Sequence, residues 1–96
     1  MQHPLVTELL SPAPNPFNPS TTIRLAVEKA ASARVEIFSL IGQRVAVLLD
    51  ETVSPGYHNL VWDGRDRSGR PVAAGSYLVR AQIGGEVFIR RVTLLK

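Results

Sequence analysis

The chain has 96 residues, 45% of them apolar, which suits one folded domain and excludes a chain that is intrinsically disordered as a whole. It contains no cysteine, which excludes a disulfide framework and a thiolate metal site. The net charge is +3, but acidic residues are interleaved with the basic ones, so we expect a mixed, solvated surface that does not bind nucleic acid.

Five of the seven prolines of the chain lie within its first 20 residues. Because proline fixes φ and removes a backbone donor, the sequence predicts an extended segment there. We expect residues 1–13 to be a lead-in from an upstream domain, in which Leu5–Val6 and Leu9–Leu10 form a short edge strand. Residues 14–96 are expected to form the folded domain.

Two Asn-Pro pairs bracket Phe17 within this segment. Each proline stiffens the chain and each asparagine side chain can bond nearby backbone, so the segment is ordered at low entropic cost. The residues concerned are Asn15, Pro16, Phe17, Asn18 and Pro19. The favoured interpretation is a rigid clamp in which Phe17 anchors on the folded body, and an exposed recognition surface is the alternative.

From Thr21 onward, apolar and polar residues alternate, which is typical of half-buried β-strands. The expected inward-facing sets are Ile23, Leu25 and Val27; Val35 and Ile37; Val45, Val47 and Leu49; and His58, Leu60 and Trp62. A helix over residues 27–40 competes with this interpretation, because residues 28–33 have high helical propensity. The period of two on both sides favours a turn followed by a strand.

The end of the chain predicts a hairpin, with strands over residues 76–83 and 86–95 and a two-residue turn at Gly84-Gly85. In the last strand, Val87 and Ile89 lie on one face while Val92 and Leu94 lie on the other. Either a bulge at residues 90–91 or burial on both faces would resolve this conflict. About seven short strands in one hundred residues predict an all-β, antiparallel β-sandwich.

Candidate chemical groups are few. His58 shares a strand face with Leu60 and Trp62, so we expect a packed histidine rather than a general base. A calcium loop starting at Asp63 would place arginines at its third and fifth positions, which oppose a cation. A turn capped by Asp66 is therefore favoured. We expect no enzymatic activity, no cofactor and no metal.

Several segments, taken in order, resemble the C-terminal sorting domains of the type IX secretion system. These segments are residues 14–23, 35–45, 56–64, 66–69, 74–77 and 90–96. The block from Trp62 to Tyr77 is also similar to the immunoglobulin-like domain of flagellar hook-capping proteins. The resemblance covers residues 14–96 and implies an immunoglobulin-like β-sandwich that is secreted or held at the outer-membrane surface.

The resemblance also implies a role and partners. Such a domain follows a cargo domain in the same chain and is recognised by the outer-membrane secretion machinery. In many cases the domain is then removed, and the cargo is attached to surface lipopolysaccharide. The implied recognition residues are the clamp, Asn15, Pro16, Phe17, Asn18 and Pro19, and the terminal strand, Arg90, Arg91, Val92, Leu94, Leu95 and Lys96. The terminal strand could also offer unpaired backbone groups to a partner, including by strand exchange in a homodimer.

Two other functions remain open. One is a structural module of an assembly such as a flagellar hook cap. The other is a carbohydrate-binding accessory module of a secreted glycosidase, which would need an exposed platform of aromatic rings, although the chain has only six aromatic residues in all.

Overall fold

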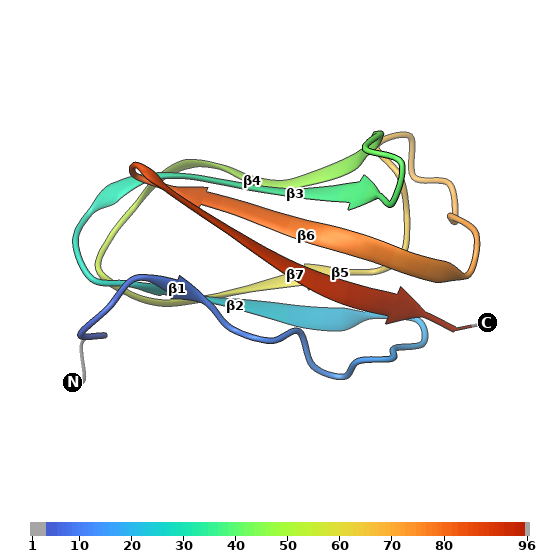
Figure 1. Cartoon of the computed structure of the whole chain (residues 1–96), viewed down its shortest axis with the longest axis horizontal. Helices are drawn as coiled ribbons and strands as arrows, with labels where there is room; N and C mark the ends of the chain where they lie inside the picture. Colours follow the sequence, from blue (N-terminus) through green and yellow to red (C-terminus); the bar gives the residue numbers. More distant parts are fainter. Residues whose placement is uncertain (1–3, 96) are drawn as a thin grey trace.

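The computed structural model describes residues 4–95, and these residues form seven β-strands in two antiparallel sheets (Figure 1). The strands are β1 (Glu8–Leu9), β2 (Thr21–Val27), β3 (Ala31–Ser39), β4 (Arg44–Val53), β5 (Gly56–Trp62), β6 (Gly75–Ile83) and β7 (Glu86–Leu94). One sheet has the order β1-β2-β5 and the other β4-β3-β6-β7. The predicted all-β sandwich is confirmed, and residues 31–39 form a strand rather than part of a helix.

The core lies between the two sheets, where the inward residues of the strands meet. In β2, Ile23, Leu25 and Val27 are fully buried, as their alternation predicts. In β5 the face of His58, Leu60 and Trp62 also points inward, as expected. Such faces pack because β-branched and aliphatic side chains fit a pleated, half-buried surface.

The segment before β2 contributes more to the core than its composition indicates. Leu9 of β1 is fully buried and pairs with Leu25 of β2. The observed edge strand comprises only residues 8–9, and Leu5 and Val6, which were predicted to belong to it, are exposed.

Within residues 4–95, no helix is long and apolar enough to cross a membrane.

The inward face predicted for β4 is right at two positions and wrong at the third. Val45 and Leu49 are partly buried and pack against the core, as predicted. Val47 is exposed, and its neighbour Ala46 is buried instead. Two irregularities in the pairing of β3 with β4 each add one residue to β4. Each extra residue reverses the alternation, because successive side chains of a strand point to opposite faces.

The conflict in β7 is resolved in a third way. The pairing of β6 with β7 runs without a shift from Gly75–Leu94 to Ile83–Glu86, so β7 has no bulge. Val92 and Leu94 face the core, while Val87 and Ile89 remain about half exposed on the outer face of the sheet. Both expected solutions, a bulge and burial on two faces, are therefore wrong.

A row of three aromatic side chains lies at one end of the core. The ring centroids of Phe17 and Trp62 are 5.4 Å apart, and those of Trp62 and Tyr77 are 5.2 Å apart. The indole Nε1 donates to the carbonyl of Arg65, and the Tyr77 hydroxyl donates to the carbonyl of Ala73 at 2.6 Å. Tyr77 lies near the start of β6. A tyrosine near the start of a strand, with its hydroxyl bonded to backbone a few residues upstream, is a hallmark of immunoglobulin-like sandwiches.

Tyr77 also makes the stability of the fold dependent on pH. Burial raises the pKa of its hydroxyl above the ordinary value of 10.0, because it disfavours the phenolate. A raised pKa in the folded state means that the stabilisation is present below pH 10 and is lost as the pH rises through the folded-state pKa. We expect the free energy of unfolding, measured by urea titration, to fall above about pH 10.

The matched variants for this measurement are Tyr77→Phe and Tyr57→Phe. Tyr77→Phe should start from a lower stability, because the bond to Ala73 is lost, and should show a shallower alkaline decline. Tyr57→Phe keeps Tyr77 in place and should retain the decline. An equally steep decline in Tyr77→Phe would contradict this assignment.

Candidate recognition surface

The clamp (Asn15–Pro19) and the C-terminal half of β7 lie side by side in the structure. Figure 1 shows the blue segment that leads into β2 running along the same end of the sandwich as the red arrowhead of β7. Phe17 forms a parallel bridge with Leu94. Two segments from opposite ends of the sequence, each predicted to act in recognition, therefore form one continuous surface.

The side chain of Asn15 pairs with the backbone of β7 as a further strand residue would. Its Nδ2 donates to the carbonyl of Arg91 at 3.0 Å, and its Oδ1 accepts from the amide of Thr93 at 3.0 Å. A carboxamide carries one donor group and one acceptor, like a peptide unit. It can therefore serve an edge strand where the flanking prolines supply no backbone N–H.

The backbone of Phe17 completes this pairing. Its amide donates to the carbonyl of Thr93 at 2.9 Å, and its carbonyl accepts from the amide of Leu95 at 2.9 Å. The Phe17 side chain is only 1% exposed and packs on Trp62. The expected anchoring of the clamp through Phe17 is confirmed, whereas a recognition role for the clamp stays a prediction.

The predicted recognition residues of β7 divide into two groups. Val92 and Leu94 are buried and belong to the core, while Arg90, Arg91 and Leu95 are exposed. Lys96 lies outside the described residues. Among the described residues of this predicted set, the folded domain therefore leaves only the two arginines and Leu95 accessible.

The clamp presents polar and proline side chains beside this strand. Asn15, Pro16, Asn18 and Pro19 are all exposed. A hollow of about 210 Å³ separates the end of the clamp from the loop after β5, and Leu95 lies on its wall. The exposed part of the surface thus combines a shallow apolar depression with two arginines.

The two arginines are not neutralised within the described part of the chain. No carboxylate among residues 4–95 lies within ion-pair distance of Arg90 or Arg91. The Arg91 guanidinium donates instead to the hydroxyl of Ser76 at 3.0 Å. Guanidinium groups that lack an ion-pair partner favour carboxylate or phosphate ligands, because they present planar pairs of donors.

Gly64 allows the loop after β5 to close over Leu94. It adopts φ +74°, and a Cβ at this position would meet Leu94 Cδ2 at 3.3 Å. Both the left-handed backbone and the close approach favour glycine. Gly64 thus also supports the buried side of β7.

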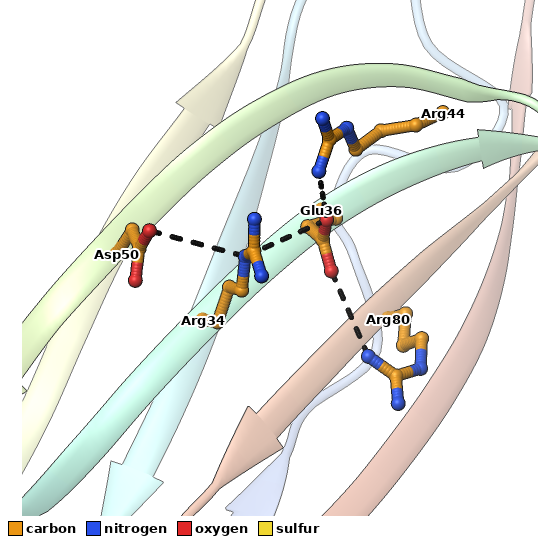
Figure 2. Close-up of polar contacts among 5 residues, drawn as sticks. All are labelled: Arg34, Glu36, Arg44, Asp50 and Arg80. Carbon is orange, nitrogen blue, oxygen red and sulfur yellow. Dashed lines mark hydrogen bonds and ion pairs between the residues drawn. The ribbon is translucent and has the colours of Figure 1, made fainter.

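A second polar cluster lies on the outer face of the four-stranded sheet (Figure 2). The Glu36 carboxylate is contacted by Arg44 at 3.2 Å and by Arg34 and Arg80 at 3.6 Å each. Arg34 also approaches Asp50 at 3.9 Å. Although its face points away from the core, Glu36 is only 4% exposed, because the three arginine side chains cover it.

The sequence pattern around Glu36 does not predict this cluster. Glu36 occupies an outward position between Val35 and Ile37, which is typical of an exposed residue. Arg44 and Arg80 come from neighbouring strands, so their approach depends on the register of the sheet. The only local signal was Arg34, which lies two positions away on the same face of β3.

The groups considered for catalysis or metal binding have structural partners. His58 lies within 2.7 Å of the carbonyl of Ser54, as expected of a packed histidine. Asp66 Oδ1 accepts from the amides of Ser68 and Arg70, which confirms the predicted cap of this turn. Within the described range, no group of three or more metal-binding side chains comes together.

A hollow of about 760 Å³ opens between β4 and β5 beside this turn. Its two carboxylates are already engaged: Asp63 pairs with Arg65 at 3.6 Å, and Asp66 caps the turn.

Solved structures of three bacterial proteins share this fold. Dimeric latent PorU from Porphyromonas gingivalis matches 94% of this chain with a TM-score of 0.74 and 20% identity. PorZ of the same organism, a surface component of its type IX secretion system, matches 92% with a TM-score of 0.58 and 20% identity. FlgD from Xanthomonas campestris, which acts in flagellar hook capping, matches 95% with a TM-score of 0.58 and 23% identity.

This chain spans only 9% of PorU, 11% of PorZ and 63% of FlgD. No curated protein sequence gives a significant match. The family model of the FlgD Ig-like domain matches residues 17–85, from Phe17 to the turn before β7. Because this match covers most of the sandwich, the chain belongs to the FlgD Ig-like domain family.

Proposed function

We propose that this domain is a non-enzymatic C-terminal sorting and attachment module, which directs an exported protein through type IX secretion and to the cell surface. Its partners are then the outer-membrane secretion machinery and a cargo domain in the same chain. The proposed reading surface consists of Arg90, Arg91 and Leu95, together with the exposed side of the clamp.

The observation that carries this proposal is the pairing of the clamp with β7. Asn15 and Phe17 hold the backbone of residues 91–95, so the terminal strand has a defined shape. Residues 15–16 and β7 lie outside residues 17–85, the part that the family model describes, whereas residues 17–19 of the clamp lie within it. Because one fold can carry many functions, this surface, and not the fold, supports the proposal.

The fold neighbours give the proposal its context. PorU and PorZ contain this fold as about one tenth of a longer chain, and PorZ is itself a surface component of type IX secretion. These similarities concern the fold alone. The exposed arginines add the chemistry, because they favour acidic groups on a receptor or on lipopolysaccharide.

A structural role in an assembly is the second candidate, and the FlgD family match favours it. A carbohydrate-binding role has less support. All six aromatic residues lie in the described range, and Tyr57 is the only one of them that is exposed. Its ring carries the Arg24 guanidinium at 4.2 Å, so several rings do not combine into a stacking platform.

The proposal is tested by secretion of a fused reporter from a bacterium with a type IX system. Deleting residues 92–96 would also remove the buried Val92 and Leu94 and would unfold the domain. The sharper variant replaces Arg90, Arg91 and Leu95 with serine and leaves the core intact. We expect at least a tenfold loss of secreted reporter, since charged and apolar anchors dominate most recognition surfaces.

The matched control replaces Arg67, Arg70 and Leu40 with serine, which are exposed residues outside the proposed surface. This control should be secreted normally, and both purified variants should keep the thermal midpoint of the wild type within a few degrees. Normal secretion of the Arg90, Arg91 and Leu95 variant would refute the proposal, and so would equal loss in both variants.

A further inference from the structure

The outer edge of β7 is divided into a covered half and an open half. The clamp occupies the backbone of residues 91–95. β7 ends the sheet order, and no described residue outside β6 is paired with residues 86–90. An exposed strand edge of this kind is a template for pairing with another strand.

The clamp contacts show which backbone groups of β7 point away from β6. The groups that bind the clamp belong to residues 91, 93 and 95. Since hydrogen-bonding direction alternates along a strand, the amides and carbonyls of Val87 and Ile89 point the same way. Two residues in the open half therefore each offer one donor and one acceptor to a partner strand.

The side chains of the open half are unusually apolar for an edge. Val87 is 49% exposed and Ile89 is 52% exposed, both on the outer face of the sheet. Ile89 also lines a shallow depression of about 300 Å³ with Phe38 and Leu78. Natural edges are more often protected by charged side chains or proline, and here the charges lie only at the two ends, Glu86 and Arg90.

We propose that the open half of β7 binds a second copy of this chain, edge to edge and antiparallel, in a register centred on Phe88. In that register Glu86 of each copy lies opposite Arg90 of the other, and Val87 lies opposite Ile89. Phe88 meets its own counterpart on the two-fold axis. The five-residue stretch is thus complementary to itself in charge.

The outward direction of the backbone groups of β7 is compatible with this register. Residues 87 and 89 both point outward, so their two pairings form four hydrogen bonds, and the Phe88 pair falls at the closer, non-hydrogen-bonded position. Aromatic and opposite-charge pairs at facing positions stabilise antiparallel strands. Moving the centre to residue 87 or 89 keeps the hydrogen-bonding direction but removes both Glu86–Arg90 pairs. Charge complementarity therefore selects one register of the three.

The shared edge is short, so we expect a weak dimer that depends on protein concentration. It differs from strand exchange, because every strand of each copy stays in its own sheet. The union joins two four-stranded sheets into one. It engages Arg90 of the proposed reading surface and leaves the clamp, Arg91 and Leu95 accessible. The inference does not depend on the proposed sorting role, and its test uses the isolated chain.

Sedimentation equilibrium of two charge variants tests the register. Glu86→Arg leaves two basic side chains at the facing positions, and Arg90→Glu leaves two acidic ones. Each variant alone should dimerise at least about tenfold more weakly than the wild type, because both attractive pairs become repulsive. An equimolar mixture should form a heterodimer, since each chain then supplies the charge that the other lacks.

A cysteine variant provides a second readout, because the natural chain has none. Phe88→Cys should form an intermolecular disulfide under mild oxidation, since the two residues face each other across the axis. Val87→Cys should form far less, because its opposite residue is Ile89. Circular dichroism checks that each variant keeps the β-sheet spectrum.

The proposal is supported by recovery of association in the mixture together with preferential crosslinking of Phe88→Cys. It is overturned if the wild type stays monomeric up to about 1 mM, where even weak interfaces associate. Association of either charge variant as strong as that of the wild type overturns it as well, because another surface would then be responsible. Failure of this test leaves the secretion experiment unaffected.

Discussion

Phe17→Ala is expected to lower the free energy of unfolding by about 3–5 kcal/mol, the range for truncating a fully buried phenylalanine. The ring is 1% exposed and packs against Trp62 in the row that ends at Tyr77. Its removal leaves a cavity that the prolines on either side cannot close by collapsing, because they restrict the backbone. For a domain of this size the loss is a large part of the total stability.

Urea titration followed by tryptophan fluorescence measures this effect directly, since Trp62 lies against the substituted ring. Phe38→Ala is the matched control, because Phe38 is partly exposed on the outer face of β3 and should lose less stability. Phe17→Ala should also release the clamp, which would appear as faster amide exchange at Thr93 and Leu95. Equal losses in both variants would show that Phe17 does not anchor the clamp.

Glu36→Gln is expected to cost about 1–3 kcal/mol of stability. Removing one partner of a fully buried ion pair typically costs about 3–5 kcal/mol. The value here is lower, because the surrounding arginine side chains are 33–44% exposed and can turn toward water. A neutral amide of the same shape leaves three guanidinium groups crowded together on neighbouring strands.

Salt distinguishes this electrostatic origin from a loss of packing. Added salt screens the repulsion among Arg34, Arg44 and Arg80, so the difference in stability between Glu36→Gln and the wild type should shrink at high ionic strength. The control is Glu51→Gln, an exposed residue of β4 without an ion pair in the described structure, and it should change stability by less than about 0.5 kcal/mol. A salt-independent difference would contradict the electrostatic explanation.

These two predictions concern opposite faces of the same sheet. Phe17 connects the clamp to the core and thereby shapes the end of β7. Glu36 neutralises part of the positive charge on the outer face, next to the depression that Ile89 lines. The three arginines around Glu36 are thus paired with a carboxylate, whereas Arg90 and Arg91 of β7 have no ion-pair partner among residues 4–95.

The sequence by itself determined the elements of the fold. Alternation and turn residues predicted strands at β2, β3, β5, β6 and β7, and they predicted the inward faces of β2 and β5. Proline stiffness predicted the clamp, and the Asp66 cap predicted the turn after β5. These features depend on local geometry, because side-chain direction along a strand and turn formation are set by residues a few positions apart.

Only the tertiary structure decided which distant residues meet. Asn15 bonds the backbone 76 positions later, and Glu36 draws its arginines from three strands. The outward turn of Val47 in β4 and the exposure of Val87 and Ile89 also depend on how strands are paired. Strand order and register arise from the packing of the whole core, and a local pattern of alternation does not record the neighbour across the sheet.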